Sequence, residues 1–303
     1  MTSGILCVRK PKGFTSFDVV AKMRGILKTR KIGHAGTLDP MAEGVLPLFV
    51  EGATKACDIM PENTKAYTAS FRLGLVTDTQ DITGTVIHQC ECFFDEETVK
   101  EKLKSFSGYI EQIPPMYSAV SVGGKRLYEL ARQGIEVERK PRKIFIEKAE
   151  LVSYDSEKSE GVIDIVCSKG TYVRTIIHDL GQLLGCGAVM TALVRTSSNG
   201  FSLDECYTLE EIQKYADEGR LDELILPVER VFESLGKIKL NSADTVLYKN
   251  GVKLSCKKYG LDEKDESIRY RVFSDDNIFL GLCFVKESAI RVFKNFNTQQ
   301  IVK

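Results

Sequence analysis

The sequence predicts an α+β protein with a large N-terminal part and a small β-rich C-terminal part. Strand-like and helix-like segments are mixed up to about residue 233. From about residue 236 the chain changes to short alternating segments separated by polar turns, such as 241–244, 250–251 and 275–277. With 303 residues, 43% of them hydrophobic, the chain can build a sizeable core. We therefore place a domain boundary between 1–233 and 234–303.

Hydrophobic spacing and cap residues predict the elements of the first hundred residues. Ser16 can cap a helix whose apolar residues recur at helical spacing up to Leu27. Asp95 can cap a second helix, with Glu96 and Glu97 in its first turn. Strands are expected at 5–8, 45–50 and 67–75.

The middle of the chain predicts a protruding insertion at about 109–143, because this stretch contains Pro114-Pro115 and Gly123-Gly124 and ends in a basic cluster. Strands are then expected near 144–152 and 161–168, a helix at about 171–184 and an apolar segment at 188–194. A further helix should start at Thr208, which forms a capping-box pattern with Glu211.

The charges are distributed unevenly although their formal sum is zero. Residues 9–31 carry eight basic side chains and one acidic side chain, and 139–143 form a second basic cluster. Residues 204–233 are strongly acidic. A basic run can be an ordinary solvated surface, but one that leads into a candidate catalytic loop favours phosphate contact.

Cysteine, histidine and hydropathy patterns argue against several classes of protein. The nine cysteines are irregularly spaced and form no C-x-x-C pair, so we expect reduced and mostly buried thiols. The three histidines have no zinc-binding spacing, and no metal is predicted. No apolar run approaches the roughly 20 residues of a membrane span, and basic residues precede any signal-peptide apolar region. We expect a cytoplasmic protein.

The most informative segment is the loop 31–44, KIGHAGTLDPMAEG, which presents Asp39 between a basic segment and an apolar strand. Gly33 and Gly36 give the backbone freedom, and Pro40 biases Asp39 away from helix. An aspartate before a proline is usually only a turn former. The length of this pattern favours an aimed carboxylate.

Two further segments carry side chains suited to a site. Tyr67 stands on a predicted strand in TKAYTASFRLGL, where a tyrosine is most often a packing residue. Arg174 lies in CSKGTYVRTIIHD, near a strand-to-helix junction. Arginine there is often a surface residue, but its guanidinium can also hold a carboxylate ionised and oriented.

These segments together resemble the TruB family of tRNA pseudouridine synthases. The loop matches the family pattern Gly-His-x-Gly-x-Leu-Asp-Pro, and the other two segments match Lys-x-Tyr and Cys-Ser-Lys-Gly-Thr-Tyr-x-Arg. Smaller matches are Lys10-Pro11, the Gly-x-Thr-Lys segment at 52–55, and 113–119 with 134–137. The resemblance runs from about residue 5 to 226.

The resemblance implies a pseudouridine synthase catalytic domain with a mixed, largely antiparallel sheet, an inserted loop that clasps RNA, and a C-terminal domain that could be of the PUA type. It implies isomerisation of uridine to pseudouridine at position 55 in the T loop of tRNA, after the base is flipped out. No cofactor is implied. The expected partner is the tRNA T arm, without guide RNA, membrane or stable oligomer.

The resemblance also assigns roles to individual residues. Asp39 is the catalytic aspartate, Arg174 its partner, and Tyr67 stacks on the uracil and helps to remove the C5 proton. His34 fills the space left in the T loop. The other expected substrate-binding residues are Tyr172, Leu193, Lys55 and Lys10.

Two other functions are also compatible with the sequence. One is the same chemistry on another RNA, as in the related guide-RNA-dependent catalytic subunits. The other is an RNA-binding or RNA-folding protein without catalysis, against which the intact Asp39, Tyr67 and Arg174 argue. The sequence also leaves open whether Asp39 adds to the nucleotide or abstracts a ribose proton.

Overall fold

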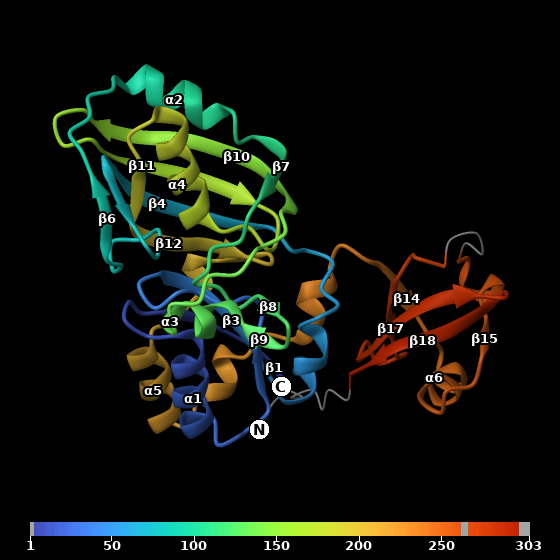
Figure 1. Cartoon of the computed structure of the whole chain (residues 1–303). Helices are drawn as coiled ribbons and strands as arrows, with labels where there is room; N and C mark the ends of the chain where they lie inside the picture. The colour runs from blue at the N-terminus through green and yellow to red at the C-terminus, as the bar shows by residue number, and fades with distance from the viewer. Residues whose placement is uncertain (1–2, 262–265, 297–303) are drawn as a thin grey trace.

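The chain builds a large sheet and a smaller C-terminal sheet (Figure 1). A computed structural model describes residues 3–261 and 266–296. The large sheet has nine strands, in the spatial order β1 (Gly4–Lys10), β3 (Glu43–Val50), β12 (Ala188–Ser198), β4 (Lys65–Leu73), β11 (Glu160–Cys167), β10 (Arg142–Asp155) and β7 (Gly108–Gln112), with β2 (Ile32–His34) beside β3 and β13 (Phe201–Ser202) beside β12. Only the β3–β12 pair is parallel. The predicted α+β class with a mixed, largely antiparallel sheet is confirmed.

Helices cover the sheet at two places and close two hydrophobic cores. Helices α2 (Glu96–Lys104) and α4 (Val173–Leu184) pack on β10 and β12 through apolar side chains such as Val99 and Ile177. Helices α1 (Ser16–Ile26) and α5 (Leu209–Asp217) pack against the β1–β3 end. Asp95 caps α2, and Thr208 forms the expected capping box with Glu211 on α5. The shorter 3-10 helices are η1 (Glu51–Ala56), η2 (Leu203–Glu205), η3 (Leu221–Leu224), η4 (Val228–Phe232) and η5 (Lys257–Tyr259).

The insertion is shorter than the predicted 109–143, because both of its ends belong to the large sheet. β7 and the start of β10 pair with each other from Gln112 and Arg142 inward. Residues 113–141 leave the sheet and carry the small hairpin β8 (Ser121–Val122) and β9 (Lys125–Arg126) and the helix α3 (Leu127–Arg132). A second hairpin, β5 (Leu75–Thr77) and β6 (Val86–Gln89), follows β4.

The C-terminal residues form a separate five-stranded sheet, with the order β14 (Gly236–Lys239), β16 (Tyr270–Phe273), β17 (Phe279–Lys286), β18 (Ala289–Asn295) and β15 (Leu254–Ser255). Residues 275–277 form the expected turn between β16 and β17. Residues 241–244, predicted as a turn, instead begin helix α6 (Ser242–Lys249), where the Asn241 side chain accepts a hydrogen bond from the Asp244 amide. Residues 297–303 of the predicted C-terminal part lie outside the described residues.

The C-terminal sheet packs on the first part of the chain through phenylalanine rings. Phe232 lies on η4, and its ring centroid is 5.7 Å from that of Phe296. The rings of Phe279 and Phe296 are stacked at 5.6 Å. These side chains share one core with Ile5 and Phe49 of β1 and β3. Figure 1 shows this sheet at one side of the large sheet.

Gly44 is required where β3 and β12 run in parallel. Its φ is +108°, and a Cβ there would lie 2.2 Å from the carbonyl oxygen of Arg195. Gly13 has a similar φ of +88° but open space around it. We expect Gly44→Ala to lower the free energy of unfolding by about 3 kcal/mol or more, through backbone strain plus overpacking, and Gly13→Ala by about 1–2 kcal/mol through strain alone. Urea unfolding measures both values, and equal losses would contradict the close contact.

Candidate active site

The loop that carries Asp39 is held by main-chain hydrogen bonds to the N-terminal segment. The Leu38 amide donates to Ser16 Oγ at 2.8 Å, and the Gly13 amide donates to the Pro40 carbonyl at 2.7 Å. Lys10 Nζ also approaches that carbonyl, at 3.4 Å. The residues on both sides of Asp39 are therefore fixed by bonds from outside the loop.

Arg195 holds the same loop from the opposite side, and the sequence did not single it out. It lies on β12 and is fully buried. Its Nε donates to the Val45 carbonyl at 2.7 Å, and its two terminal nitrogens reach the carbonyls of Gly36 at 3.2 Å and Thr37 at 3.5 Å. The available signal was a charged residue that directly follows the apolar segment 188–194.

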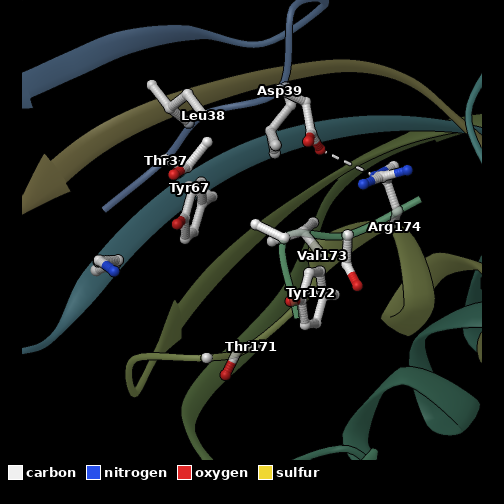
Figure 2. A pocket seen from close by; sticks show the side chains of 13 residues that line it. Thr37, Leu38, Asp39, Tyr67, Thr171, Tyr172, Val173 and Arg174 are labelled. Atoms are coloured by element: carbon white, nitrogen blue, oxygen red, sulfur yellow. Dashed lines mark ion pairs between the residues drawn. The ribbon is translucent and has the colours of Figure 1, made fainter. Parts of the chain in front are cut away.

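Arg174 pairs with Asp39 at the start of α4. Arg174 Nε lies 2.9 Å from Asp39 Oδ2, and the exposed fractions of the two side chains are 4% and 36% (Figure 2). The helix start is fixed by the Gln112 side-chain amide, which accepts from the Tyr172 amide at 2.8 Å and donates to its carbonyl at 3.0 Å. The guanidinium is therefore held in place before any substrate arrives.

The remaining donors of Arg174 are also used, and one of them points to a second carboxylate. Arg174 donates to the carbonyls of Thr79 at 2.8 Å and Tyr117 at 2.9 Å. Asp81 Oδ2 lies 3.5 Å from Arg174 and its side chain is buried. Asp81 Oδ1 accepts from the amide and the hydroxyl of Thr83. Asp81 carries no signal of its own in the sequence, because it stands among the other polar residues of 78–85.

A cavity of about 250 Å³ lies in front of this ion pair. Asp39, Tyr67 and Arg174 come from three distant parts of the chain and meet at its wall. Figure 2 shows the Asp39 carboxylate directed at Arg174, with Tyr67 on the neighbouring strand β4 and Tyr172 facing the same space. The wall is completed by Thr37, Leu38, Lys65, Ser118, Ala119, Gly170, Thr171, Val173 and Leu193. Ser118 and Ala119 belong to the insertion, so the insertion contributes to the cavity.

Burial shifts the pKa values of ionisable side chains that line the cavity. Burial raises the pKa of Asp39, and the Arg174 guanidinium opposes that rise. Burial also raises the pKa of the Tyr67 phenol, against the lowering effect of Arg195. Burial lowers the pKa of Lys65 to about 8. The ion pair with Arg174 is thus what favours an anionic Asp39 in this site.

Five of the predicted site residues line the cavity, namely Asp39, Tyr67, Tyr172, Arg174 and Leu193. The other three, described next, lie elsewhere. Residues from the Asp39 and Tyr67 segments therefore meet residues from a segment that lies more than a hundred positions later in the chain.

His34, Lys10 and Lys55 do not line the cavity. His34 is half-buried on β2, and burial together with Arg195 lowers its pKa. Lys10 is fully buried, so it does not present the free ammonium that a direct RNA ligand needs; it donates to the carbonyls of Pro11 and Phe14 instead. Lys55 is exposed on η1 and donates to the Asn295 carbonyl at 3.1 Å.

The basic segment before the loop is mostly at the surface, as phosphate contact requires. Its exposed basic side chains are Arg9, Lys12, Lys22, Lys28, Arg30 and Lys31. None of the nine cysteines, all of which lie in the described ranges, is joined to another in a disulfide, and five of them are buried. Across residues 3–261 and 266–296, no group of three or more His, Cys, Asp or Glu side chains could hold a metal ion. No helix in the described part of the chain is long and apolar enough to cross a membrane.

Comparison with known proteins gives two adjoining family matches. Residues 24–173 match the N-terminal domain of the TruB family pseudouridylate synthases. Residues 174–233 match the C-terminal domain of tRNA pseudouridylate synthase B. The boundary between the two falls at Arg174, inside the site.

Individual relatives and solved structures agree with these matches. The chain is 40% identical to tRNA pseudouridine synthase B of Clostridium kluyveri, covering 97% of this chain and 99% of that one. It is 46% identical to the Bacillus licheniformis protein of the same name, covering 84% of each. A Cbf5-Nop10-Gar1 crystal structure contains a chain with a TM-score of 0.74 and 25% identity, covering 97% of this chain and 84% of that one. A chain in an H/ACA RNP bound to a substrate RNA, at 23% identity and a TM-score of 0.73, shares the fold and covers 97% of this chain and 84% of that one.

The Asp39 loop, Tyr67 and the paired Arg174 thus meet in one cavity, within a chain whose relatives match along nearly its whole length. The chain belongs to the TruB family of tRNA pseudouridine synthases, the isomerases that convert uridine to pseudouridine in tRNA.

Proposed function

We propose that this chain isomerises the uridine at position 55 in the T loop of tRNA, with Asp39 as the essential catalytic residue. The observation that carries this proposal is the Asp39–Arg174 ion pair at the wall of a cavity that Tyr67 and Leu193 also line. An anionic oxygen can react with the nucleotide, and a flat ring and an apolar wall can hold the uracil while its bond to the ribose is exchanged.

The reaction breaks the bond between N1 of uracil and C1′ of the ribose, turns the base, and forms a bond from C5 to C1′. C5 loses its proton and N1, now free of the ribose, gains one from water, so atoms balance and no electrons are gained or lost overall. The Asp39 carboxylate can add to the nucleotide or take a proton from the ribose, and either route needs it anionic. Arg174 keeps the carboxylate charged and directed into the cavity.

The target base must leave its stack to reach the cavity, because a base inside a folded loop is inaccessible. We propose that the flipped uracil lies between Tyr67 and Leu193, whose side chains are almost fully buried in the cavity wall. Tyr172 contributes a second ring to the same space. Tyr67 then takes part in removing the C5 proton.

His34 is proposed to fill the gap that the flipped base leaves in the T loop. Its lowered pKa favours a neutral imidazole at neutral pH, which suits stacking better than a charged contact to phosphate. Lys55 and the exposed basic segment are proposed to contact the RNA backbone. Lys10 is proposed to act on the substrate through the loop that it holds.

We expect His34→Ala to weaken tRNA binding about tenfold and to slow modification, since an open gap lets the uracil return to its stack. Lys31→Ala, at a neighbouring exposed residue, is the control. It should lower the salt dependence of tRNA binding without slowing the chemical step. Filter binding and single-turnover kinetics measure both effects. Normal binding and modification by His34→Ala would show that the gap-filling role is wrong.

We propose that the chain acts as a monomer in the cytoplasm, on tRNA alone and without cofactor or guide RNA. The fold is shared with Cbf5-type chains of guide-RNA complexes, so guide dependence is the alternative to test. A purified chain that modifies a T-arm RNA with nothing else added excludes that alternative.

The direct test uses T-arm RNA labelled with tritium at C5 of uridine. Release of tritium by the chain but not by Asp39→Asn distinguishes an enzyme from an RNA-binding protein with the same scaffold. Binding without release by the unaltered chain would overturn the proposed function.

A further inference from the structure

We propose that Arg195 is a positioning residue that joins Tyr67 to the Asp39 loop, so that the two sides of the cavity keep one fixed spacing. The inference rests on the proposed function, because it gives Tyr67 and Asp39 their parts in the reaction. Arg195 does not line the cavity and acts only through the groups that it holds.

The register of the large sheet places Arg195 beside Tyr67. The two residues are direct partners in the antiparallel β4–β12 pair. As direct antiparallel partners, the Arg195 and Tyr67 side chains lie next to each other on the same face of the sheet, and the positive charge of Arg195 opposes the rise in the pKa of the Tyr67 phenol. Arg195 also donates hydrogen bonds to the loop carbonyls of Gly36 and Thr37. One guanidinium therefore lies beside the proposed base-stacking residue and bonds to the loop two residues before Asp39.

A purely structural role does not explain the charge of Arg195. Burying an unpaired cation is costly, and neutral side chains can also donate to carbonyls. Among the residues that the structure describes, no carboxylate lies within ion-pair distance of Arg195. Its guanidinium instead lies beside its strand partner Tyr67, which lines the cavity together with Asp39. Lys65 adds a second cation near Arg195.

Arginine is suited to this role because its planar fork donates in several fixed directions at once. Nε donates to Val45 on β3, which leaves the two terminal nitrogens for the loop carbonyls of Thr37 and Gly36. Lysine keeps the charge but cannot reach all of these acceptors. Glutamine keeps a donor but loses the charge.

The test compares Arg195→Gln, Arg195→Lys, Tyr67→Phe and the two double variants in single-turnover tritium release and tRNA binding. We expect Arg195→Gln to slow the chemical step about 100-fold while the tRNA Kd changes less than about threefold. Arg195→Lys should recover about tenfold of that loss. In the Tyr67→Phe background, the loss from Arg195→Gln should be at least about fivefold smaller, because one of its two targets is missing.

Arg271→Gln is the matched control. Arg271 is half-buried in the C-terminal sheet and donates through Nε to the Leu235 carbonyl at 3.0 Å, the same kind of contact away from the cavity. Its chemical rate should stay within about twofold of the unaltered chain. If Arg195→Gln does not fold, as judged by thermal unfolding, the cycle of Arg195→Lys with Tyr67→Phe decides the question.

Three results would overturn the inference: an unchanged chemical rate in both Arg195 variants, a loss confined to tRNA affinity, or losses from Arg195 and Tyr67 that multiply independently. The unaltered chain and Asp39→Asn are measured in the same assay. If the unaltered chain releases no tritium, the proposed function fails. If it releases tritium and the Arg195 variants do so at the same rate, only this inference fails.

Discussion

Replacing Asp39 with asparagine is expected to lower the single-turnover rate of pseudouridine formation by about 10⁴-fold or more. Asparagine has nearly the same shape, so the loop bonds of Leu38 and Pro40 stay in place. It can neither add to the nucleotide as a carboxylate does nor accept a ribose proton. The tRNA Kd should therefore change little, within about threefold.

Asp164→Asn is the matched control for that substitution. Asp164 lies on β11 of the same sheet and accepts a hydrogen bond from Thr68 at 2.7 Å, but it does not line the cavity. Its rate should equal that of the unaltered chain. A residual rate above about one per cent in Asp39→Asn would show that another group carries the chemistry.

Replacing Arg174 with alanine is expected to slow the chemical step by about 10³-fold and to leave tRNA binding largely intact. The substitution removes the group that orients Asp39 at 2.9 Å and opposes the rise of its pKa. Removing one member of a buried ion pair typically costs about 3–5 kcal/mol of stability. Asp39 is 36% exposed, so water can partly replace the guanidinium and the cost should be smaller. Unchanged single-turnover rates would remove Arg174 from the mechanism.

The pH dependence follows from the same pair. Burial raises the pKa of Asp39 above 3.8, so the active anion is lost at a higher pH than for an ordinary aspartate as the solution is acidified. Arg174→Ala removes the opposing charge and should move this acid limb further upward in pH. Arg174→Lys keeps a charge and should lie between the two. A profile that does not move would show that Asp39 ionisation does not control the rate.

The sequence predicted the groups of the site that lie in contiguous motifs. Asp39, Tyr67 and Arg174 each stand in a segment whose neighbours give the local backbone, and the three segments meet at one cavity. Arg195 and Asp81 could not be found in this way, because their roles depend on which strand and which turn lie beside them. Lys10 was expected at the RNA surface; its burial depends on carbonyls that only the folded N-terminal segment brings together.

The fold shows the same division between local and long-range signals. The caps at Asp95 and Thr208 were predictable, since a cap bonds to an amide three residues away. Residues 241–244 have the sequence of a turn but cap and begin α6, because the same polar residues favour both structures. The insertion was predicted to begin at residue 109 rather than 113, because β7 at the sheet edge has polar, exposed positions like those of a loop. The position of β12 between β3 and β4 in the large sheet depends on long-range pairing and has no signal in the local sequence.

The most direct measurement uses full-length tRNA that carries tritium at C5 of a single uridine. With the label at position 55, the purified chain alone should release the tritium in proportion to the pseudouridine formed, and Asp39→Asn should release none. With the label at a neighbouring uridine of the T loop, no release should occur. Release from the neighbour but not from position 55, or equal release by Asp39→Asn, would contradict the assignment.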